Sequence, residues 1–128
     1  MKLKTITYLC LYVSNFRESI EFYKDILGLV PLNPDEDINT SNFYVFKTGE
    51  TKLAIERKGV RKKELKTKAE NPFLLQFQVD SKKELEAMSS QLEKKGVVLI
   101  DRSKQEHYGL FTNFCDPDGN KLEIICAI

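Results

Sequence analysis

The sequence contains few of the residue types that build disulfide frameworks and transition-metal sites. It has a single histidine, His107, and three cysteines, Cys10, Cys115 and Cys126. The cysteines are odd in number, lie within apolar segments and form no Cys-x-x-Cys pair. This usage predicts reduced thiols in a cytoplasmic protein, because disulfide frameworks and structural zinc sites need paired cysteines.

The chain also lacks a charge imbalance and a long apolar segment. Its 20 lysine and arginine residues oppose 19 aspartate and glutamate residues, so the net charge of +1 gives no overall field for nucleic acid or an anionic membrane. No segment approaches the roughly 18 apolar residues of a membrane span. The apolar start alternates with Thr7 and Tyr8 and has no small-residue cleavage site, which favours a strand over a signal peptide. We therefore expect no nucleic-acid partner and no membrane partner.

Several common catalytic motifs are absent as well. The sequence has no glycine-rich phosphate loop, dinucleotide-binding fingerprint, Gly-x-Ser-x-Gly turn or His-Glu-x-x-His zinc motif. Its 128 residues, 41% hydrophobic and 30% charged, are instead typical of one ordinary globular domain.

What the chain does contain is one pattern of elements that occurs twice. Each half begins with an alternating strand and continues with an N-capped amphipathic helix that a glycine ends, at Gly28 and Gly96. Three short strands follow each helix. The first half has strands at 4–13, 29–32, 43–46 and 52–56, and the second has them at 74–79, 97–100, 110–115 and 121–127. The sequence therefore predicts an α+β fold of two tandem β-α-β-β-β modules.

The modules span about residues 1–57 and 71–128, and a basic segment of about 58–70 joins them. This segment has no core-facing period and no interleaved aromatic residues, so a solvated linker is favoured over a nucleic-acid or phosphate site. In the first strand, alternation assigns Leu11 and Val13 to one face and Tyr8 and Tyr12 to the other.

Two segments resemble the vicinal oxygen chelate superfamily, which includes glyoxalase I, bleomycin-resistance-type binding proteins and extradiol dioxygenases. They are LCLYVSNFRESIEFYKDILGL at residues 9–29 and DPDGNKLEI at residues 116–124. The resemblance covers nearly the whole chain. It implies a glyoxalase-like domain whose mixed sheet curls around a cleft shared by the two modules, commonly in a homodimer.

Metal-dependent members of this superfamily place four ligands on cleft-facing strands. The resemblance puts these ligands at Tyr8, Glu56, Leu74 and Glu123, so both usual histidine positions carry other residues. Phenol is seldom a ligand at neutral pH and leucine is none, so we expect no cofactor. The alternative is a divalent ion such as Mg²⁺ or Mn²⁺ held weakly by Glu56 and Glu123. Matching Lys52-Leu53-Ala54 to Lys121-Leu122-Glu123 places Ala54, rather than Glu56, opposite Glu123.

The candidate site combines aromatic, apolar, amide and acidic side chains. The ligand-binding candidates are Tyr8, Tyr12, Glu56, Leu74, Gln76, His107, Phe111 and Glu123. Glu123 and His107 are the catalytic candidates, because a carboxylate in an apolar cleft or an imidazole can transfer a proton near neutral pH. The simpler interpretations stay open: solvated glutamates, an exposed loop histidine, and side chains that fill the cleft. The pattern leaves open which face Phe111 and Asn113 take.

Three functions are consistent with these residues. The first is metal-independent binding of a small organic molecule in the cleft, which a mixed apolar and amide lining suits. The second is a glyoxalase-type lyase or isomerase that uses Glu123, and Glu56 with it, around a divalent metal. The third is a non-catalytic member of the fold that acts through dimerisation or a protein partner. Missing histidines favour the first, and the sequence leaves open whether the protein is an enzyme.

Overall fold

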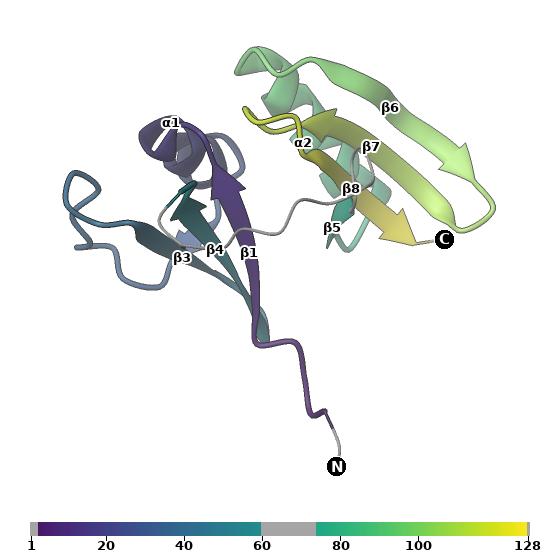
Figure 1. Cartoon of the computed structure of the whole chain (residues 1–128). Coiled ribbons are helices and arrows are strands. Elements are labelled where there is room, and N and C mark those ends of the chain that lie inside the picture. Colours follow the sequence, from purple (N-terminus) through teal and green to yellow (C-terminus); the bar gives the residue numbers. More distant parts are fainter. Residues whose placement is uncertain (1–2, 60–73, 128) are drawn as a thin grey trace. The chain divides into compact units, whose positions relative to one another are not determined.

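The computed structural model describes residues 3–59 and 74–127. The chain divides into two compact units, residues 1–65 and 66–128, and each is described by itself (Figure 1). The predicted linker of about 58–70 lies outside the described residues apart from a turn at Lys58 and Gly59. The cleft that the resemblance implies between the modules stays a prediction.

The first unit is a mixed four-stranded sheet with one helical segment. Its elements are β1 (Tyr8–Val13), α1 (Phe16–Glu21), the π-helix η1 (Phe22–Ile26), β2 (Val30–Pro31), β3 (Phe43–Thr48) and β4 (Thr51–Arg57). The strand order is β1-β4-β3-β2, with β1 parallel to β4 and the other neighbours antiparallel. Pro31 lies in the edge strand β2, as expected of a residue that cannot donate to a ladder.

The helical segment begins and ends where the sequence predicts. The side chain of Asn15 accepts a hydrogen bond from the backbone N–H of Glu18 at 3.1 Å, which caps α1. Gly28, with φ of 75°, ends the segment. Between them the backbone widens, and the N–H of Leu27 bonds the carbonyl of Phe22 five residues earlier at 3.0 Å. The apolar stripe did not predict this π-helical turn.

The helical segment covers one face of the first sheet. Leu11 and Val13 are each 1% exposed, whereas Tyr8 and Tyr12 are 42% and 41% exposed, so the predicted alternation of β1 is confirmed. The strand is shorter than predicted, because it begins at Tyr8 rather than near Lys4. The core of this unit consists of Leu11, Val13, Phe16, Ile20, Phe22, Tyr23, Tyr44, Phe46, Leu53 and Ile55.

The second unit repeats this topology. Its elements are β5 (Leu74–Gln78), α2 (Lys82–Lys94), β6 (Leu99–Glu106), β7 (Gly109–Cys115) and β8 (Lys121–Ala127). The order β5-β8-β7-β6 corresponds strand for strand to that of the first unit, again with the first pair parallel. Ser81 caps α2 by accepting the N–H of Glu84 at 3.1 Å. No helix within the two described ranges is long and apolar enough to cross a membrane.

Strand β6 is the main departure from the predicted elements. A strand was expected at 97–100, but β6 runs from Leu99 to Glu106. Its register with β7 shifts at Asp101 and again before Lys104, and Ser103 between them has a left-handed backbone with φ of 50°. The shorter prediction was wrong because an edge strand with charged residues and bulges shows no apolar alternation.

Candidate functional site

The helix-free face of the second sheet carries the central candidates. Gln76, Glu123 and Asn113 are partners across β5, β8 and β7, so their side chains lie on one face of the sheet. Thr112 bonds Ser89 of α2 through the two hydroxyls at 2.7 Å, so its neighbours Phe111 and Asn113 face away from the helix. This settles the orientation that the sequence left open.

The carboxylate of Glu123 is nearly buried and bonds an amide. Glu123 is 5% exposed, and the amide nitrogen Nε2 of Gln76 donates to its Oε1 at 2.9 Å. The side chain of Asn113 accepts the backbone N–H of Asp101 through Oδ1 at 2.8 Å. Among the described residues no other side chain donates to Glu123, and Lys121 on the same face forms no ion pair with it. No described residue bonds the second carboxylate oxygen of Glu123 or the NH₂ group of Asn113.

An aromatic pair adjoins this polar trio. Phe111 lies two residues before Asn113 on β7, and its ring stacks on that of Tyr108 with centroids 6.1 Å apart and planes 10° apart. Tyr108 is 47% exposed and offers an open ring face. His107, exposed in the turn between β6 and β7, packs edge-on against Tyr108 at 5.2 Å. The face thus combines a carboxylate, two amides and a flat apolar surface.

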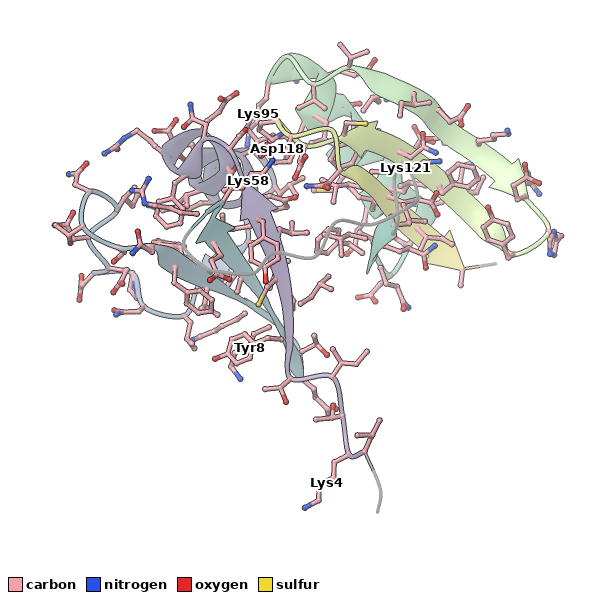
Figure 2. All side chains as sticks on the ribbon, in the orientation of Figure 1. Lys4, Tyr8, Lys58, Lys95, Asp118 and Lys121 are labelled. Atoms are coloured by element: carbon pink, nitrogen blue, oxygen red, sulfur yellow. The ribbon has the colours of Figure 1, made fainter. Side chains whose placement is uncertain are left out.

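The equivalent face of the first sheet is more aromatic. Arg57 stacks on Phe16 of α1, so Glu56 before it points away from the helix, beside its cross-strand partners Tyr12 and Phe43. Tyr8 lies at the other end of this face (Figure 2). The Nζ atom of Lys52 is 5.4 Å from the centroid of its ring.

The strand registers settle how the two glutamates correspond. Tyr8 pairs with Lys52 as Leu74 pairs with Lys121, and the next pairs along are Cys10–Ala54 and Gln76–Glu123. The first-unit counterpart of Glu123 is therefore Ala54, as the sequence match predicts. Glu56 lies one pair further along the same face.

The four positions that the resemblance aligns with metal ligands do not fit a family-type metal centre. Tyr8 and Leu74 supply no imidazole, and the cross-strand neighbours of Glu123 are amides. Within residues 3–59 and 74–127 no group of three or more histidine, cysteine, aspartate or glutamate side chains could hold a metal ion.

The structure brings the predicted residues together in two sets. Tyr8, Tyr12 and Glu56 share the helix-free face of the first sheet, and Leu74, Gln76, Phe111 and Glu123 share that of the second. Glu56 and Glu123 are each 5% exposed, so neither is a solvated surface carboxylate. His107 contacts Tyr108, whose ring stacks on Phe111 of the second face. Sequence reasoning left out Tyr108, and the Tyr-Gly pair that opens β7 was the available signal.

Comparisons with known proteins agree with this fold. A sequence model of the Glyoxalase/Bleomycin resistance protein/Dioxygenase superfamily matches residues 5–124. The chain is 36% identical over 123 residues to an uncharacterized protein, YraH, of Bacillus subtilis (strain 168), and the match covers 89% of this chain and 91% of that protein.

Two solved structures illustrate the shared architecture. TnmS3, an antibiotic binding protein from Streptomyces sp. CB03234, has a TM-score of 0.76 and 20% identity, covering 100% of this chain and 99% of that one. A glyoxalase/dioxygenase from Nostoc punctiforme has a TM-score of 0.78 and 22% identity, covering 98% and 92%. Since the superfamily match extends over nearly the whole sequence, this chain belongs to the Glyoxalase/Bleomycin resistance protein/Dioxygenase superfamily.

Proposed function

We propose that this protein binds a small organic molecule on the helix-free face of its second unit, without a metal ion. The observation that carries the proposal is the hydrogen bond between Gln76 and Glu123. At a position where metal-dependent relatives are expected to have a metal ligand, this chain has a nearly buried carboxylate held by an amide. Such a carboxylate suits a hydrogen-bonding ligand better than a transition metal.

The groups left available indicate the chemistry of the ligand. Glu123 Oε2 and Gln76 Oε1 are acceptors, and Asn113 Nδ2 is a donor; no described residue bonds these three atoms. Two acceptors beside one donor favour a ligand with an N–H group, such as an amine or an amide. The exposed ring of Tyr108 favours a flat, apolar body next to that group.

The comparisons support binding as a use of this fold. TnmS3, which has the same architecture, is an antibiotic binding protein. A sequence identity of 20% supports a shared fold but says nothing about a shared ligand. The ligand class proposed here therefore rests on Glu123, Gln76 and Asn113. We further expect the chain to act as a homodimer, as the resemblance to its superfamily implies.

The test uses three probes that share a phenyl ring and differ in their polar group. The ¹⁵N-labelled full chain, dialysed against a chelator, is titrated with benzylamine, benzamide and benzoate. We expect benzylamine and benzamide to shift the backbone amide signals of Gln76, Asn113 and Glu123, and benzoate to leave them unchanged. Glu123→Gln should weaken benzylamine binding about tenfold, or about 1.4 kcal/mol. Glu50→Gln, in the turn between β3 and β4, is the control for loss of one carboxylate.

A native mass spectrum of the chain purified without chelator tests metal independence and the homodimer together. We expect a dimer without a stoichiometric metal ion. A divalent ion at one per chain that is lost in Glu123→Gln would instead favour the glyoxalase-type alternative. Benzoate binding as tightly as benzylamine would contradict the proposed role of the carboxylate.

A further inference from the structure

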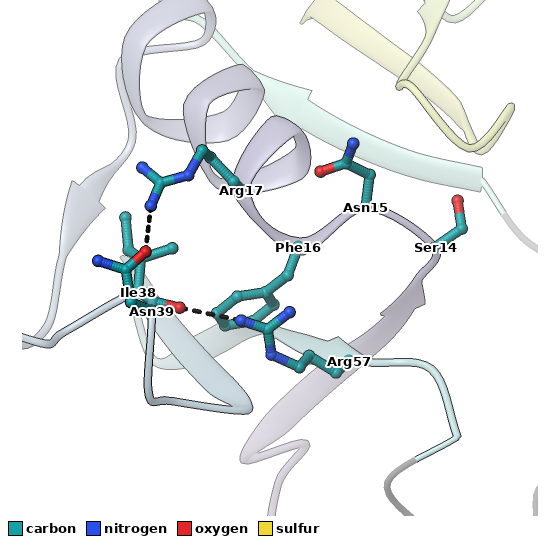
Figure 3. A pocket seen from close by; sticks show the side chains of 7 residues that line it. All are labelled: Ser14, Asn15, Phe16, Arg17, Ile38, Asn39 and Arg57. Carbon is teal, nitrogen blue, oxygen red and sulfur yellow. Dashed lines mark hydrogen bonds between the residues drawn. The ribbon is translucent and has the colours of Figure 1, made fainter.

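A concave site lies in the first unit, on the helical side of its sheet. A cavity of about 290 Å³ opens between the start of α1 and the loop that precedes β3 (Figure 3). Its lining consists of Ser14, Asn15, Phe16, Arg17, Ile38, Asn39 and Arg57. All of its lining residues belong to the first unit, whereas the proposed ligand face belongs to the second, so the two sites share no residue.

Arg57 is held in one orientation at the base of this cavity. Its Nε donates to the carbonyl of Ser41 and its Nη2 to the carbonyl of Ile38, each at 2.9 Å. Its guanidinium carbon lies 4.3 Å from the centroid of the Phe16 ring. Nη1 donates to no described residue and points away from Ile38 (Figure 3). Two N–H groups of a fixed guanidinium are thus left for a ligand.

The two asparagines in the lining each accept one hydrogen bond through the side-chain oxygen. Asn15 Oδ1 accepts the backbone N–H of Glu18 at 3.1 Å, and Asn39 Oδ1 accepts Nη2 of Arg17 at 2.5 Å. No described residue accepts a hydrogen bond from either NH₂ group, so both can serve as donors in the cavity. Since these amide oxygens face donors, the orientation of both amides follows from their partners.

The cavity is consequently rich in donors and positive charge. Two guanidinium groups line it, and no carboxylate is among its described lining residues. Two carboxylates of the adjacent loop accept hydrogen bonds within the loop. Asp37 Oδ1 accepts the N–H of Asn39 at 2.9 Å, and Glu36 accepts the hydroxyl of Ser41.

We propose that this cavity binds a small molecule through an oxyanion, either a carboxylate or a phosphate group. Guanidinium groups bind both through paired N–H···O bonds, and a preorganised fork loses little entropy on binding. A volume of about 290 Å³ exceeds the needs of a bare ion and is close to the lower bound for ligand pockets. The occupant is therefore the acidic end of a small organic acid or phosphate ester.

The test titrates the ¹⁵N-labelled full chain with sodium phosphate, sodium acetate and sodium chloride at matched ionic strength. We expect phosphate, acetate or both to give saturable shifts of the backbone amides at 14–17 and 38–39, and chloride to give none. Tighter binding of phosphate would identify a phosphate ester as the occupant, and tighter binding of acetate a carboxylic acid. Equal shifts with chloride would overturn the proposal.

Three variants separate specific binding from general charge effects. Arg17 is exposed, and Asn39 is its only hydrogen-bond partner within residues 3–59 and 74–127. Arg17→Gln should therefore leave the fold intact and weaken oxyanion binding at least fivefold. Lys24→Gln removes the same charge from η1, outside the cavity, and should leave affinity unchanged. Arg57→Lys keeps the positive charge but removes the guanidinium group with its paired N–H donors. It should weaken binding as Arg17→Gln does. Equal affinity in wild type and Arg17→Gln would show that the cavity does not bind the anion.

Discussion

Gln76 and Glu123 face each other across the parallel strands β5 and β8, and the amide nitrogen of Gln76 lies 2.9 Å from a carboxylate oxygen of Glu123. The corresponding pair in the first unit is Cys10 and Ala54, which brings no charged group to its sheet. The two units therefore repeat a topology without repeating its chemistry. One helix-free face pairs its carboxylate with an amide, and the other places the carboxylate of Glu56 beside the rings of Tyr12 and Phe43.

Removal of the amide donor should cost stability, because the nearly buried side chain of Glu123 would lose its hydrogen-bond partner. We expect Gln76→Leu to lower the free energy of unfolding by about 1–3 kcal/mol, as for a polar group that loses its partner. Urea denaturation measures the change. In the double variant Gln76→Leu/Glu123→Leu both polar groups are gone, and most of the loss should be recovered. Strictly additive losses would show that the two side chains are energetically independent.

The turn before β8 depends on one carboxylate in the segment that resembles the superfamily. Asp116 is 5% exposed, and its Oδ1 accepts the backbone N–H groups of Asp118 and Asn120 at 3.0 and 2.8 Å. Its Oδ2 accepts the side-chain amide of Asn120 at 2.9 Å. Asp116→Ala removes all three of these hydrogen bonds and should destabilise the chain by about 2–3 kcal/mol, because the nearly buried turn loses its acceptors.

Asp116→Asn is the matched control for this turn. It keeps one oxygen for the two backbone N–H groups and places an NH₂ group against the amide of Asn120. Urea denaturation should therefore give a loss smaller than that of Asp116→Ala. Equal losses would mean that the bond to the Asn120 side chain dominates the turn.

Much of the fold could be predicted because its strands alternate and its helices carry caps. Tyr8 and Tyr12 face away from the helix and Leu11 and Val13 toward it, as a period of two requires for a half-buried strand. The π-helical turn at 22–26 could not be predicted, since its apolar residues fit an ordinary helical stripe equally well. The full length of β6 could not be predicted for another reason. Its bulges and charged side chains leave no alternation of apolar and polar residues to detect.

The candidate site was predictable only in part. Gln76 and Glu123 were assigned to the right face because each lies between apolar residues that point to the core. Asn113 was not, because its neighbour Thr112 is also polar and still faces the helix. A buried hydroxyl that is satisfied by another hydroxyl looks the same in a sequence as a solvated one.

An exposed ion-pair cluster on α2 and β6 should make a small, pH-dependent contribution to stability. Arg102 bonds Glu86 and Glu93, each at 2.8 Å. The Ser103 hydroxyl and the Arg102 guanidinium lower the pKa of the Glu86 carboxyl. The Ser103 hydroxyl forms no hydrogen bond with a described residue, so we expect Arg102 to be the main cause of the lowered pKa.

A carboxyl whose pKa is lowered by folding stabilises the fold above its unfolded pKa and loses that effect as the pH falls through its folded pKa. Arg102→Gln should therefore lower the melting temperature slightly at pH 7, and the difference from wild type should shrink below about pH 4. High salt should shrink it as well. Lys104→Gln, on the same strand with a looser 3.7 Å pair to Glu106, is the control. A difference that persists at pH 2 would rule out the carboxyl as its source.

A chain of buried hydroxyls ties the bulge of β6 to α2. The backbone N–H of Ser103 donates to Thr112 Oγ1 at 3.0 Å, and Ser89 Oγ donates to the carbonyl of Leu85 at 2.8 Å. The two hydroxyls lie 2.7 Å apart. Because the single hydroxyl hydrogen of Ser89 is already donated to the carbonyl of Leu85, Thr112 must be the donor in the hydrogen bond between the two hydroxyls. Thr112 is thus both acceptor and donor at a fully buried position.

Thr112→Val keeps the shape of the side chain and removes this link, so the N–H of Ser103 loses its acceptor and Ser89 its donor. We expect the free energy of unfolding to fall by about 1–3 kcal/mol and hydrogen exchange at the Ser103 amide to accelerate. Thr112→Ser keeps the hydroxyl and removes one methyl group, which should cost about 1 kcal/mol and leave that exchange slow. If the serine variant were the less stable of the two, methyl packing rather than the hydroxyl chain would hold the bulge against the helix.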